Sequence, residues 1–250
     1  MGFVGGAFDC FISLIFPRRC EICDRGLSPS RSLPLCVEHA REIIPTEAPV
    51  CGKCGRKMFG ESVESLVCAR CRSMRVSYDA GYSACLYEGT LRELVHRFKY
   101  TKRRYLGWFL GELIVNYVRE HADGFRYEGI IPVPLHWRRY WSRGFNQAAD
   151  LARPLSRRYR LPVLRRSLRR VRYTRPQVSL GPEERRTNIR GAFRVRRPAR
   201  VVGKKLLLID DVITTGATLN ECARVLKGAG ATEVTIVTVA HPSGFRAHRL

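Results

Sequence analysis

The sequence lacks any apolar run long enough to cross a bilayer, because no stretch reaches the roughly 18 apolar residues that a membrane-spanning helix needs. It also lacks the basic n-region and the small-residue cleavage site of a secretory signal peptide. The apolar start, residues 1–18, carries Phe8, Phe11, Ile12 and Ile15 at helical spacing, which predicts a short N-terminal docking helix. These features predict a cytoplasmic protein without a membrane span.

Two common nucleotide-binding motifs are also missing. The chain has no G-x-x-x-x-G-K-[ST] motif, which disfavours a P-loop nucleoside triphosphatase. It has no G-x-G-x-x-G motif, which disfavours a dinucleotide-binding fold. Any phosphate-binding site in this chain must therefore be built in another way.

Acidic residues are scarce, with 22 Asp and Glu against 45 Lys and Arg, a formal net charge of +23. The excess is uneven, since residues 138–200 hold 20 arginines and only three acids, Asp150, Glu183 and Glu184. Such a field favours polyanionic partners: nucleic acid, phosphorylated ligands or anionic lipid. An arginine-rich composition that serves solubility is the alternative interpretation. The 45% hydrophobic content is enough for a folded core.

Cysteine is abundant, and six of the ten cysteines form three C-x-x-C pairs. A fourth pair has the same spacing with a histidine, Cys36-Val-Glu-His39. This spacing lets two ligands from one tight turn meet a tetrahedral ion at about 2.0–2.3 Å, and two such turns complete a structural site. We therefore predict two structural Zn²⁺ ions. The simplest, sequential pairing assigns Cys20, Cys23, Cys36 and His39 to one ion, and Cys51, Cys54, Cys68 and Cys71 to the other.

Other uses of these cysteines are less consistent with the sequence. A cross-braced pairing of the same ligands stays open at this point. Disulfides would require an oxidising compartment, and no export signal is visible. Thioredoxin-like redox chemistry would need one C-x-x-C beside a strand–helix unit rather than several in a row. Cys10, Cys85 and Cys222 lie in apolar surroundings and are predicted to be small core residues.

The rest of the chain alternates strand and helix patterns, which predicts a doubly wound, mostly parallel α/β sheet. A zinc-ribbon module over residues 19–75 precedes this α/β domain, which we place at residues 76–250. The charged segment 166–190 has no apolar periodicity and is predicted to be a mobile loop. The predicted strands cover residues 82–87, 128–134, 192–195, 205–209 and 232–240, and the predicted helices cover residues 91–98, 106–118, 143–159 and 217–227.

The stretch KKLLLIDDVITTGATL, residues 204–219, places two aspartates at the end of an apolar strand, then a small polar loop and a helix start. Ligands of such sheets bind beyond the carboxyl ends of the strands. The free amides and the positive dipole at a helix start favour an anion, and Gly216 permits a tight turn beside threonine hydroxyls. The stretch therefore predicts a monophosphate site. Asp210 and Asp211 are placed to accept hydrogen bonds from sugar hydroxyls or to hold hydrated Mg²⁺.

LLLIDDVITTGAT resembles the thirteen-residue signature of type I phosphoribosyltransferases, which bind 5-phosphoribosyl 1-pyrophosphate (PRPP). The resemblance implies that Asp210 and Asp211 meet the ribose hydroxyls. The turn Pro132-Val133-Pro134 resembles the pyrophosphate-binding loop of the same enzymes. The 5-phosphate would be held by Thr214, Thr215, Gly216, Ala217 and Thr218.

The order of motifs along the whole chain is similar to that of the ComF family, which includes competence proteins and GntX-like relatives. The resemblance runs from about residue 17 to the end of the chain and implies a double zinc ribbon followed by a phosphoribosyltransferase-like domain. His39 stands where a cysteine is common in the family. The matching segments are the cysteine-rich module, LYEGTLRELVHRFKY, IPVPLHWRRYWSRGFNQAADLA, Gln177, ERRTN at 184–188, GAF at 191–193 and the signature.

Phosphoribosyl transfer passes through an oxocarbenium-like sugar as pyrophosphate leaves, so the protein must position the reactants and neutralise the leaving charge. Mg²⁺ together with basic side chains would supply that neutralisation. Arg143 and Arg185 are the catalytic candidates. Arg143 and Asn146 are also candidates for PRPP binding, and Lys99 is a weaker one.

Two hypotheses on function follow, and no acceptor-recognition element decides between them. The first is a ComF-like protein that binds PRPP and single-stranded DNA in DNA uptake or utilisation, with a DNA-uptake helicase or other competence proteins as partners. The alternative is an active Mg²⁺-dependent phosphoribosyltransferase of a nitrogenous acceptor in nucleotide metabolism. The ribbons and arginines favour the first, as do interleaved aromatic residues that could stack on bases. These are Trp137, Tyr140, Trp141 and Phe145.

Overall fold

The computed structural model describes residues 18–28, 33–58, 66–74, 76–122, 124–174 and 187–243. Residues 1–17 of the predicted N-terminal helix lie outside the described residues, as do Cys10 and Arg185. Among the helices of the described part, none is both long and apolar enough to cross a membrane.

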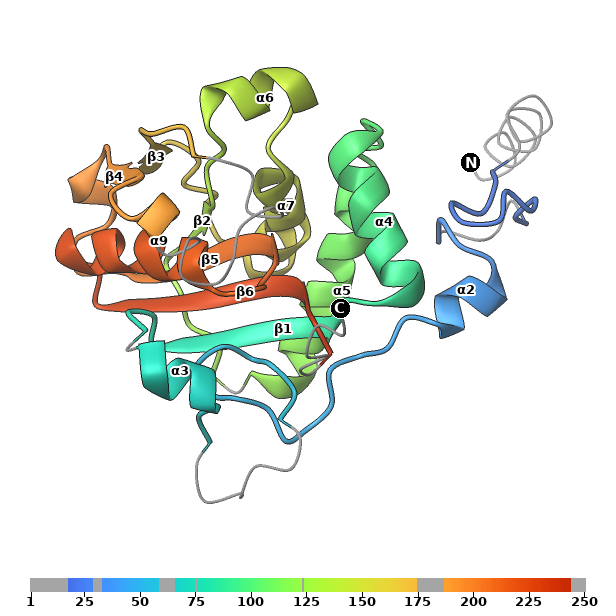
Figure 1. Cartoon of the computed structure of the whole chain (residues 1–250), viewed down its shortest axis with the longest axis horizontal. Helices are drawn as coiled ribbons and strands as arrows, with labels where there is room; N and C mark the ends of the chain where they lie inside the picture. The colour runs from blue at the N-terminus through green and yellow to red at the C-terminus, as the bar shows by residue number, and fades with distance from the viewer. Residues whose placement is uncertain are drawn as a thin grey trace, which may run out of the picture.

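A four-stranded, all-parallel sheet forms the centre of the fold, in the order β1-β6-β5-β2 (Figure 1). The two middle strands are mostly buried, and residues 206–209 are fully buried, as expected of strands that are covered on both faces. The predicted mostly parallel α/β sheet is thus confirmed. The strands are β1 (Ala80–Leu86), β2 (Gly129–Pro132), β5 (Lys205–Val212) and β6 (Glu233–His241).

Helices cover both faces of this sheet (Figure 1). Three of them, α4 (Gly89–Tyr100), α5 (Leu106–His121) and α7 (Gln147–Tyr159), lie on one side, and α9 (Ala217–Gly228) packs on the other. The apolar residues of α4 at helical spacing, from Leu91 to Phe98, all face the core. The doubly wound arrangement therefore follows from the periodicity of the sequence.

Two segments differ from the sequence-based prediction. The helix predicted over 143–159 is present but begins at residue 147, because a separate helix, α6 (Trp137–Arg143), precedes it and ends at Gly144, whose φ of 78° is left-handed. Asn146 then caps a new helix, α7, by accepting a hydrogen bond from the amide of Ala148 at 3.0 Å.

The prediction of a loop throughout 166–190 is also wrong at one place. β3 (Leu168–Arg170) pairs antiparallel with β4 (Phe193–Val195). The strand was hidden because its two arginines break the apolar pattern, although Arg170 is in fact buried.

The two ribbon modules sit differently against this domain (Figure 1). The first contains α2 (Val37–Arg41) and lies beside α4, whereas the second contains α3 (Ala69–Met74) and lies beside β1. The connecting segment, residues 44–46, pairs antiparallel with the outer edge of β1. The amide of Thr46 donates to the carbonyl of Ala84, and the amide of Leu86 donates to the carbonyl of Ile44, both at 2.9 Å.

A buried histidine at the end of β6 joins the second ribbon to the sheet. The amide of Lys57 donates to Nε2 of His241 at 3.1 Å, and Nδ1 lies 2.9 Å from the carbonyl of Pro242. Burial lowers the pKa of His241 to about 4, so the ring is neutral at physiological pH and Nε2 can accept this hydrogen bond. The same Nε2 lies 3.3 Å from the hydroxyl of Thr46.

The second ribbon approaches β1 so closely that glycine is required at the contact. A Cβ at Gly81 would lie 2.4 Å from the carbonyl oxygen of Lys53, and a Cβ at Gly55 would lie 2.6 Å from the amide nitrogen of Ser83. Because both obstacles are backbone atoms, no side-chain rotation could relieve the clash. Backbone-to-backbone packing thus fixes the ribbon on the sheet.

We expect Gly81→Ala to lower the free energy of unfolding by about 1–3 kcal/mol, because the ribbon must shift away from β1. Gly52→Ala is the matched control in the same ribbon, since its Cβ would meet only the carbonyl of Leu66 at 3.5 Å. Urea unfolding of both variants measures the effect. Equal midpoints for the two variants would contradict this account of the contact.

Candidate functional site

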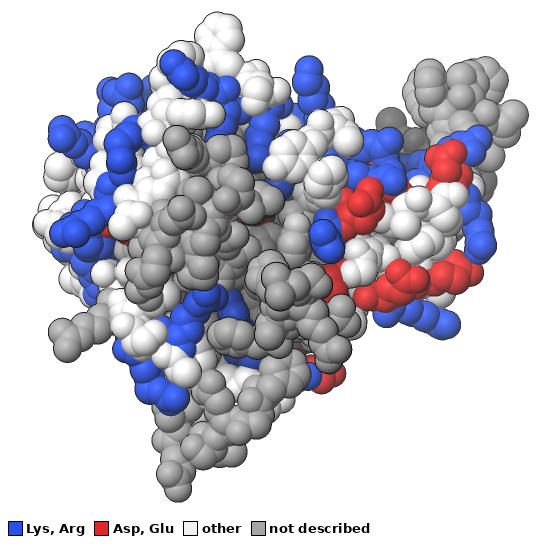
Figure 2. All heavy atoms as spheres, in the orientation of Figure 1, with Lys and Arg blue, Asp and Glu red and all other residues white. Residues whose placement is uncertain are grey.

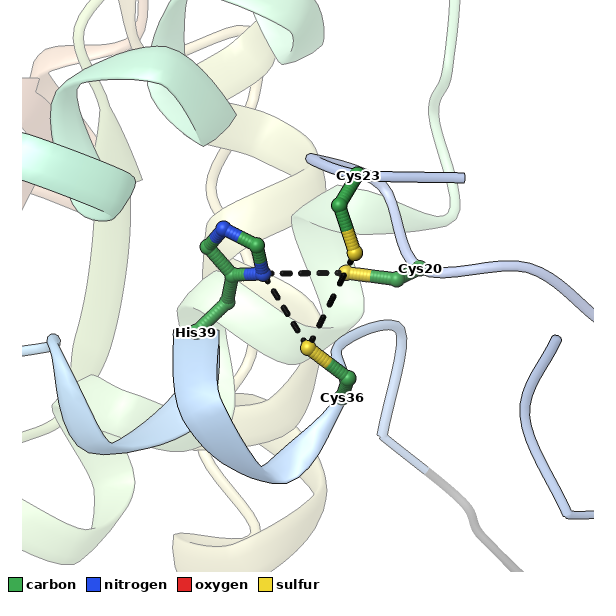
Figure 3. Close-up of side chains that lie close together, drawn as sticks. All are labelled: Cys20, Cys23, Cys36 and His39. Atoms are coloured by element: carbon green, nitrogen blue, oxygen red, sulfur yellow. Dashed lines mark hydrogen bonds between the residues drawn. The ribbon is translucent and has the colours of Figure 1, made fainter. Parts of the chain in front are cut away.

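The first group of metal-ligand residues brings Cys20, Cys23, Cys36 and His39 together (Figure 3). The two cysteines of the first turn face Cys36 and His39, which come from the start of α2. Nδ1 of His39 lies 3.0 Å from Sγ of Cys36 and 3.6 Å from Sγ of Cys20. The histidine that departs from the family pattern is therefore oriented as a ligand.

The second group contains Cys51, Cys54, Cys68 and Cys71, all buried. Hydrogen bonding between the thiols of Cys51 and Cys54 lowers the pKa of the first and raises that of the second. The ligands are grouped sequentially in both clusters, not cross-braced.

The distances between ligand atoms fit zinc. A tetrahedron with Zn–S bonds of about 2.3 Å has edges of about 3.8 Å. The Cys23–Cys36 and Cys54–Cys68 sulfur pairs are each 3.9 Å apart. All four ligand atoms of each cluster lie within 4.8 Å of one another. Both groups therefore suit a structural zinc ion, with four protein ligands and no position left for a reacting water.

A separate cavity of about 750 Å³ opens at the carboxyl ends of β2 and β5. Every residue that the sequence predicted for PRPP binding lines it except Pro132, which ends β2 and is buried. Lys99 lines it as well. The predicted residues that line the cavity are Val133, Arg143, Asn146, Asp210, Asp211, Thr214, Thr215, Gly216, Ala217 and Thr218.

The loop at residues 213–217 forms one wall of the cavity and leads into α9. Ile213 is buried and anchors the loop, while Gly216 has a φ of 76° and caps the helix. The hydroxyl of Thr215 accepts a hydrogen bond from the amide of Ala217 at 3.4 Å. Amides at the start of a twelve-residue helix carry partial positive charge, so this wall favours an anion.

The two aspartates at the end of β5 have different environments. Asp211 forms an ion pair with Lys99, whose Nζ lies 2.7 Å from Oδ1. Burial is the largest single effect on the pKa of Lys99 and lowers it, but the charge and hydrogen bond of Asp211 together with the charge of Asp210 outweigh burial and raise the pKa, so the ammonium keeps its charge. Burial and the neighbouring Asp211 raise the pKa of Asp210 from 3.8 to about 7. Asp210 can therefore be either protonated or ionised near neutral pH.

On the opposite wall of the cavity, the side chain of Asn146 connects the turn after β2 to the start of α7. Its Nδ2 donates to the carbonyl of Val133 at 3.1 Å, while its Oδ1 caps α7. Asn146 therefore holds the turn after β2 in place. Arg143 stacks over the ring of Tyr100 at 5.2 Å and points its charge to the same cavity.

Sequence reasoning missed Arg170, which contributes a buried positive charge to the cavity wall. Its guanidinium lies over the ring of Phe193 and donates to the hydroxyl of Thr174, and its Nε has no hydrogen-bond partner among the described residues. Burial and the nearby Arg139 lower its pKa to about 10. Only the pairing of β3 with β4 brings it to the cavity, so no local pattern could have identified it. Arg139 and Tyr173 also line the cavity and were not predicted.

Charged side chains are unevenly distributed over the surface (Figure 2). Acidic side chains gather on the lobe around α2, while Lys and Arg predominate over the region of α6, β3 and β4. Trp137, Tyr140 and Trp141 of α6 are 58%, 49% and 81% exposed. Phe145 differs from them, because it is buried against Phe98 and cannot serve as a surface stacking residue.

Two known domain families match different parts of the chain. Residues 11–72 match the double zinc ribbon domain. Residues 142–249 match the phosphoribosyl transferase domain. A solved structure of adenine phosphoribosyltransferase from Thermoanaerobacter pseudethanolicus overlaps 60% of this chain and 74% of its own, at 15% identity and a TM-score of 0.36.

Similar proteins extend over nearly the whole chain. Competence protein F of Haemophilus influenzae is 32% identical over 225 residues, covering 88% of this chain and 96% of its own. The DNA utilization protein YhgH of Salmonella typhimurium is 32% identical, covering 89% and 96%. Competence protein ComFC of Streptococcus pneumoniae is 27% identical over 59% of this chain and 62% of its own. The chain therefore belongs to the family of competence protein F and the DNA utilization proteins, in which a double zinc ribbon precedes a phosphoribosyltransferase domain.

Proposed function

We propose that this protein binds PRPP with Mg²⁺ in the cavity at the carboxyl ends of β2 and β5, binds single-stranded DNA on α6, and acts in DNA uptake or utilisation. One observation carries the ligand assignment. An anion-favouring loop that starts α9 and two adjacent carboxylates that end β5 open into a single cavity. A phosphorylated sugar carries a phosphate and hydroxyls in one molecule, so a single ligand could contact both groups.

Each part of PRPP has a counterpart in this cavity. The amides and hydroxyls of Thr215 and Thr218 would receive the 5-phosphate. Asp210 and Asp211 would accept hydrogen bonds from the ribose hydroxyls and offer oxygen ligands to Mg²⁺, which neutralises phosphate charge when bound. The turn at Val133, with Arg143 beside it, would face the pyrophosphate.

Turnover is the second candidate function, and a specific feature favours it. The cavity continues past the signature residues to a cationic and aromatic wall made by Tyr100, Arg139 and Tyr173. Transfer would break the bond between ribose C1 and the pyrophosphate oxygen and form a bond between C1 and the acceptor nitrogen, and Arg139 would help to neutralise the pyrophosphate that leaves. A nitrogenous acceptor could stack on the rings of the same wall. Arg185, the other catalytic candidate, lies outside the described residues.

The DNA-binding proposal is supported by the composition of α6. Arg138 stacks over the rings of Trp137 and Tyr173 at 5.3 and 5.2 Å, which leaves a cation flanked by exposed aromatic faces. Aromatic platforms beside positive charge are typical of single-strand binding. A protein partner such as a DNA-uptake helicase is part of this proposal on the strength of the ComF resemblance.

Calorimetry with PRPP and Mg²⁺ tests the ligand assignment. We expect the wild type to bind and Asp211→Asn to bind at least about tenfold more weakly, because one charged acceptor is lost. Omitting Mg²⁺ should weaken binding by the wild type. Glu120→Gln on the exposed surface of α5 is the control and should bind like the wild type. No heat of binding from the wild type would refute the assignment.

The raised pKa of Asp210 predicts how stability depends on pH without ligand. Between pH 3.8 and 7 the folded protein holds a proton that the unfolded chain releases, so this group makes folding less favourable as pH rises through that window. Asp210→Asn removes the effect and should be more stable than the wild type above pH 7 by on the order of 1–4 kcal/mol. Urea unfolding of both proteins from pH 5 to 8 measures the difference. A difference that does not change with pH would contradict the prediction.

Fluorescence anisotropy with labelled oligo-dT tests the DNA surface. Trp137→Ala/Trp141→Ala should weaken binding about tenfold for each stacked base that is lost. Arg138→Gln should reduce the salt slope by about one. Trp108→Ala on α5, whose ring is covered by Arg157, is the matched control. If the α6 variants bind like the wild type while the wild type binds DNA, α6 is not the binding surface.

A further inference from the structure

Two arginines of the second ribbon reach the back of the loop at residues 213–217. Arg56 follows the knuckle that carries Cys54, and Arg70 lies on α3 between Cys68 and Cys71. Nη2 of Arg56 and Nη1 of Arg70 each donate to the carbonyl oxygen of Thr214 at 2.8 Å. Two guanidinium groups from residues that flank a metal cluster thus converge on one backbone atom of the candidate ligand loop.

Further contacts extend this junction into the first turn of α9. The hydroxyl of Tyr78 lies 3.8 Å from Sγ of Cys71, and it would lie 3.5 Å from a Cβ placed on Gly216. The amide of Ser77 donates to Oδ1 of Asn220 at 2.6 Å. The second cluster, the loop and the helix start are therefore one packed unit.

A zinc-loaded second cluster would carry the charge that balances the two arginines at this junction. Two guanidinium groups that share one acceptor repel each other. A Zn²⁺ ion with four thiolates carries a net charge of −2, which offsets the two arginines beside it. Bound zinc would thus stabilise the arrangement in which both arginines donate to the carbonyl of Thr214.

The first cluster has no comparable contact with the loop. Its nearest described link to the α/β domain is Glu21, which accepts hydrogen bonds from Arg103 and Tyr105. None of the described residues of the first ribbon lines the cavity. The second cluster is therefore linked to the candidate ligand loop and the first is not, although the two clusters have the same ligand spacing.

We propose that Arg56 and Arg70 are positioning residues of the ligand site and that the second zinc cluster sets the conformation of the phosphate loop through them. With both arginines on the carbonyl of Thr214, the loop amides that follow are held toward the cavity. The inference rests on the proposed PRPP site, and linkage requires that PRPP and zinc at the second cluster strengthen each other's binding.

The test uses the full chain with Arg56→Gln/Arg70→Gln, which keeps all eight metal ligands. Metal analysis should still find two zinc ions per chain. Hydrogen exchange should become at least about tenfold faster at the amides of residues 214–217, since charge-assisted hydrogen bonds that restrain the loop are lost. Binding of PRPP with Mg²⁺ should weaken about tenfold or more in calorimetry.

Three controls separate positioning from general damage. Arg72→Gln, on the same helix but bonded to the carbonyl of Val67, should leave the loop amides and the affinity unchanged. Arg56→Lys/Arg70→Lys, which keeps both charges, should recover part of both effects. Cys36→Ser, which disrupts the first cluster, should not accelerate exchange in the loop.

The outcomes are distinct. If the glutamine variant keeps zinc and its loop amides exchange as in the wild type, the positioning role is refuted, whatever its affinity. If the wild type does not bind PRPP, the proposed function fails, but faster loop exchange in the glutamine variant alone still supports the link between cluster and loop.

Discussion

The parallel pairing of β5 between β2 and β6 is the constraint on which the ligand cavity depends. Pro132 lies opposite Ile209 in the register, and the amide of Val133 donates to the carbonyl of Ile209 at 2.9 Å. The turn after β2 and the acids after β5 must therefore leave the sheet at the same edge. Lys99 and Asn146 reach this edge from the helices that cover the sheet, so groups from four elements meet without any of them being strained into place.

Features built from consecutive residues could be predicted from the sequence, whereas contacts that form only when distant segments fold together were missed. The stretch from Leu206 to Thr218 could be interpreted alone, because a strand end, a glycine turn and a helix start are consecutive. Gly144 was overlooked because apolar spacing continues across the break that it makes. Arg170 was hidden in a charged segment, since its burial depends on a strand pair. Arg56 lies 158 residues from Thr214, and no periodicity reports contacts at such a distance.

The charge distribution explains how adjacent carboxylates are tolerated in so basic a protein. Asp211 is paired with Lys99, and Arg170 lies close enough to Asp210 to lower its pKa, although burial raises it by more. The surplus of positive charge lies over α6, β3 and β4, whereas the acids of the first ribbon pair with cations beside them, as Glu38 does with Arg25. A polyanion would thus approach the cavity side rather than the first ribbon.

The segment at residues 44–46 has a consequence for how the protein can be divided. An exposed strand edge is a template for pairing with other chains, and here the outer edge of β1 is occupied by residues from before the sheet begins. A fragment starting near residue 76 would retain every strand of the sheet yet uncover that edge, together with the apolar face that the second ribbon occupies. The compositional boundary between ribbon and enzyme-like domain is therefore not a boundary of folding, and a fragment cut there would tend to self-associate rather than behave as an independent unit.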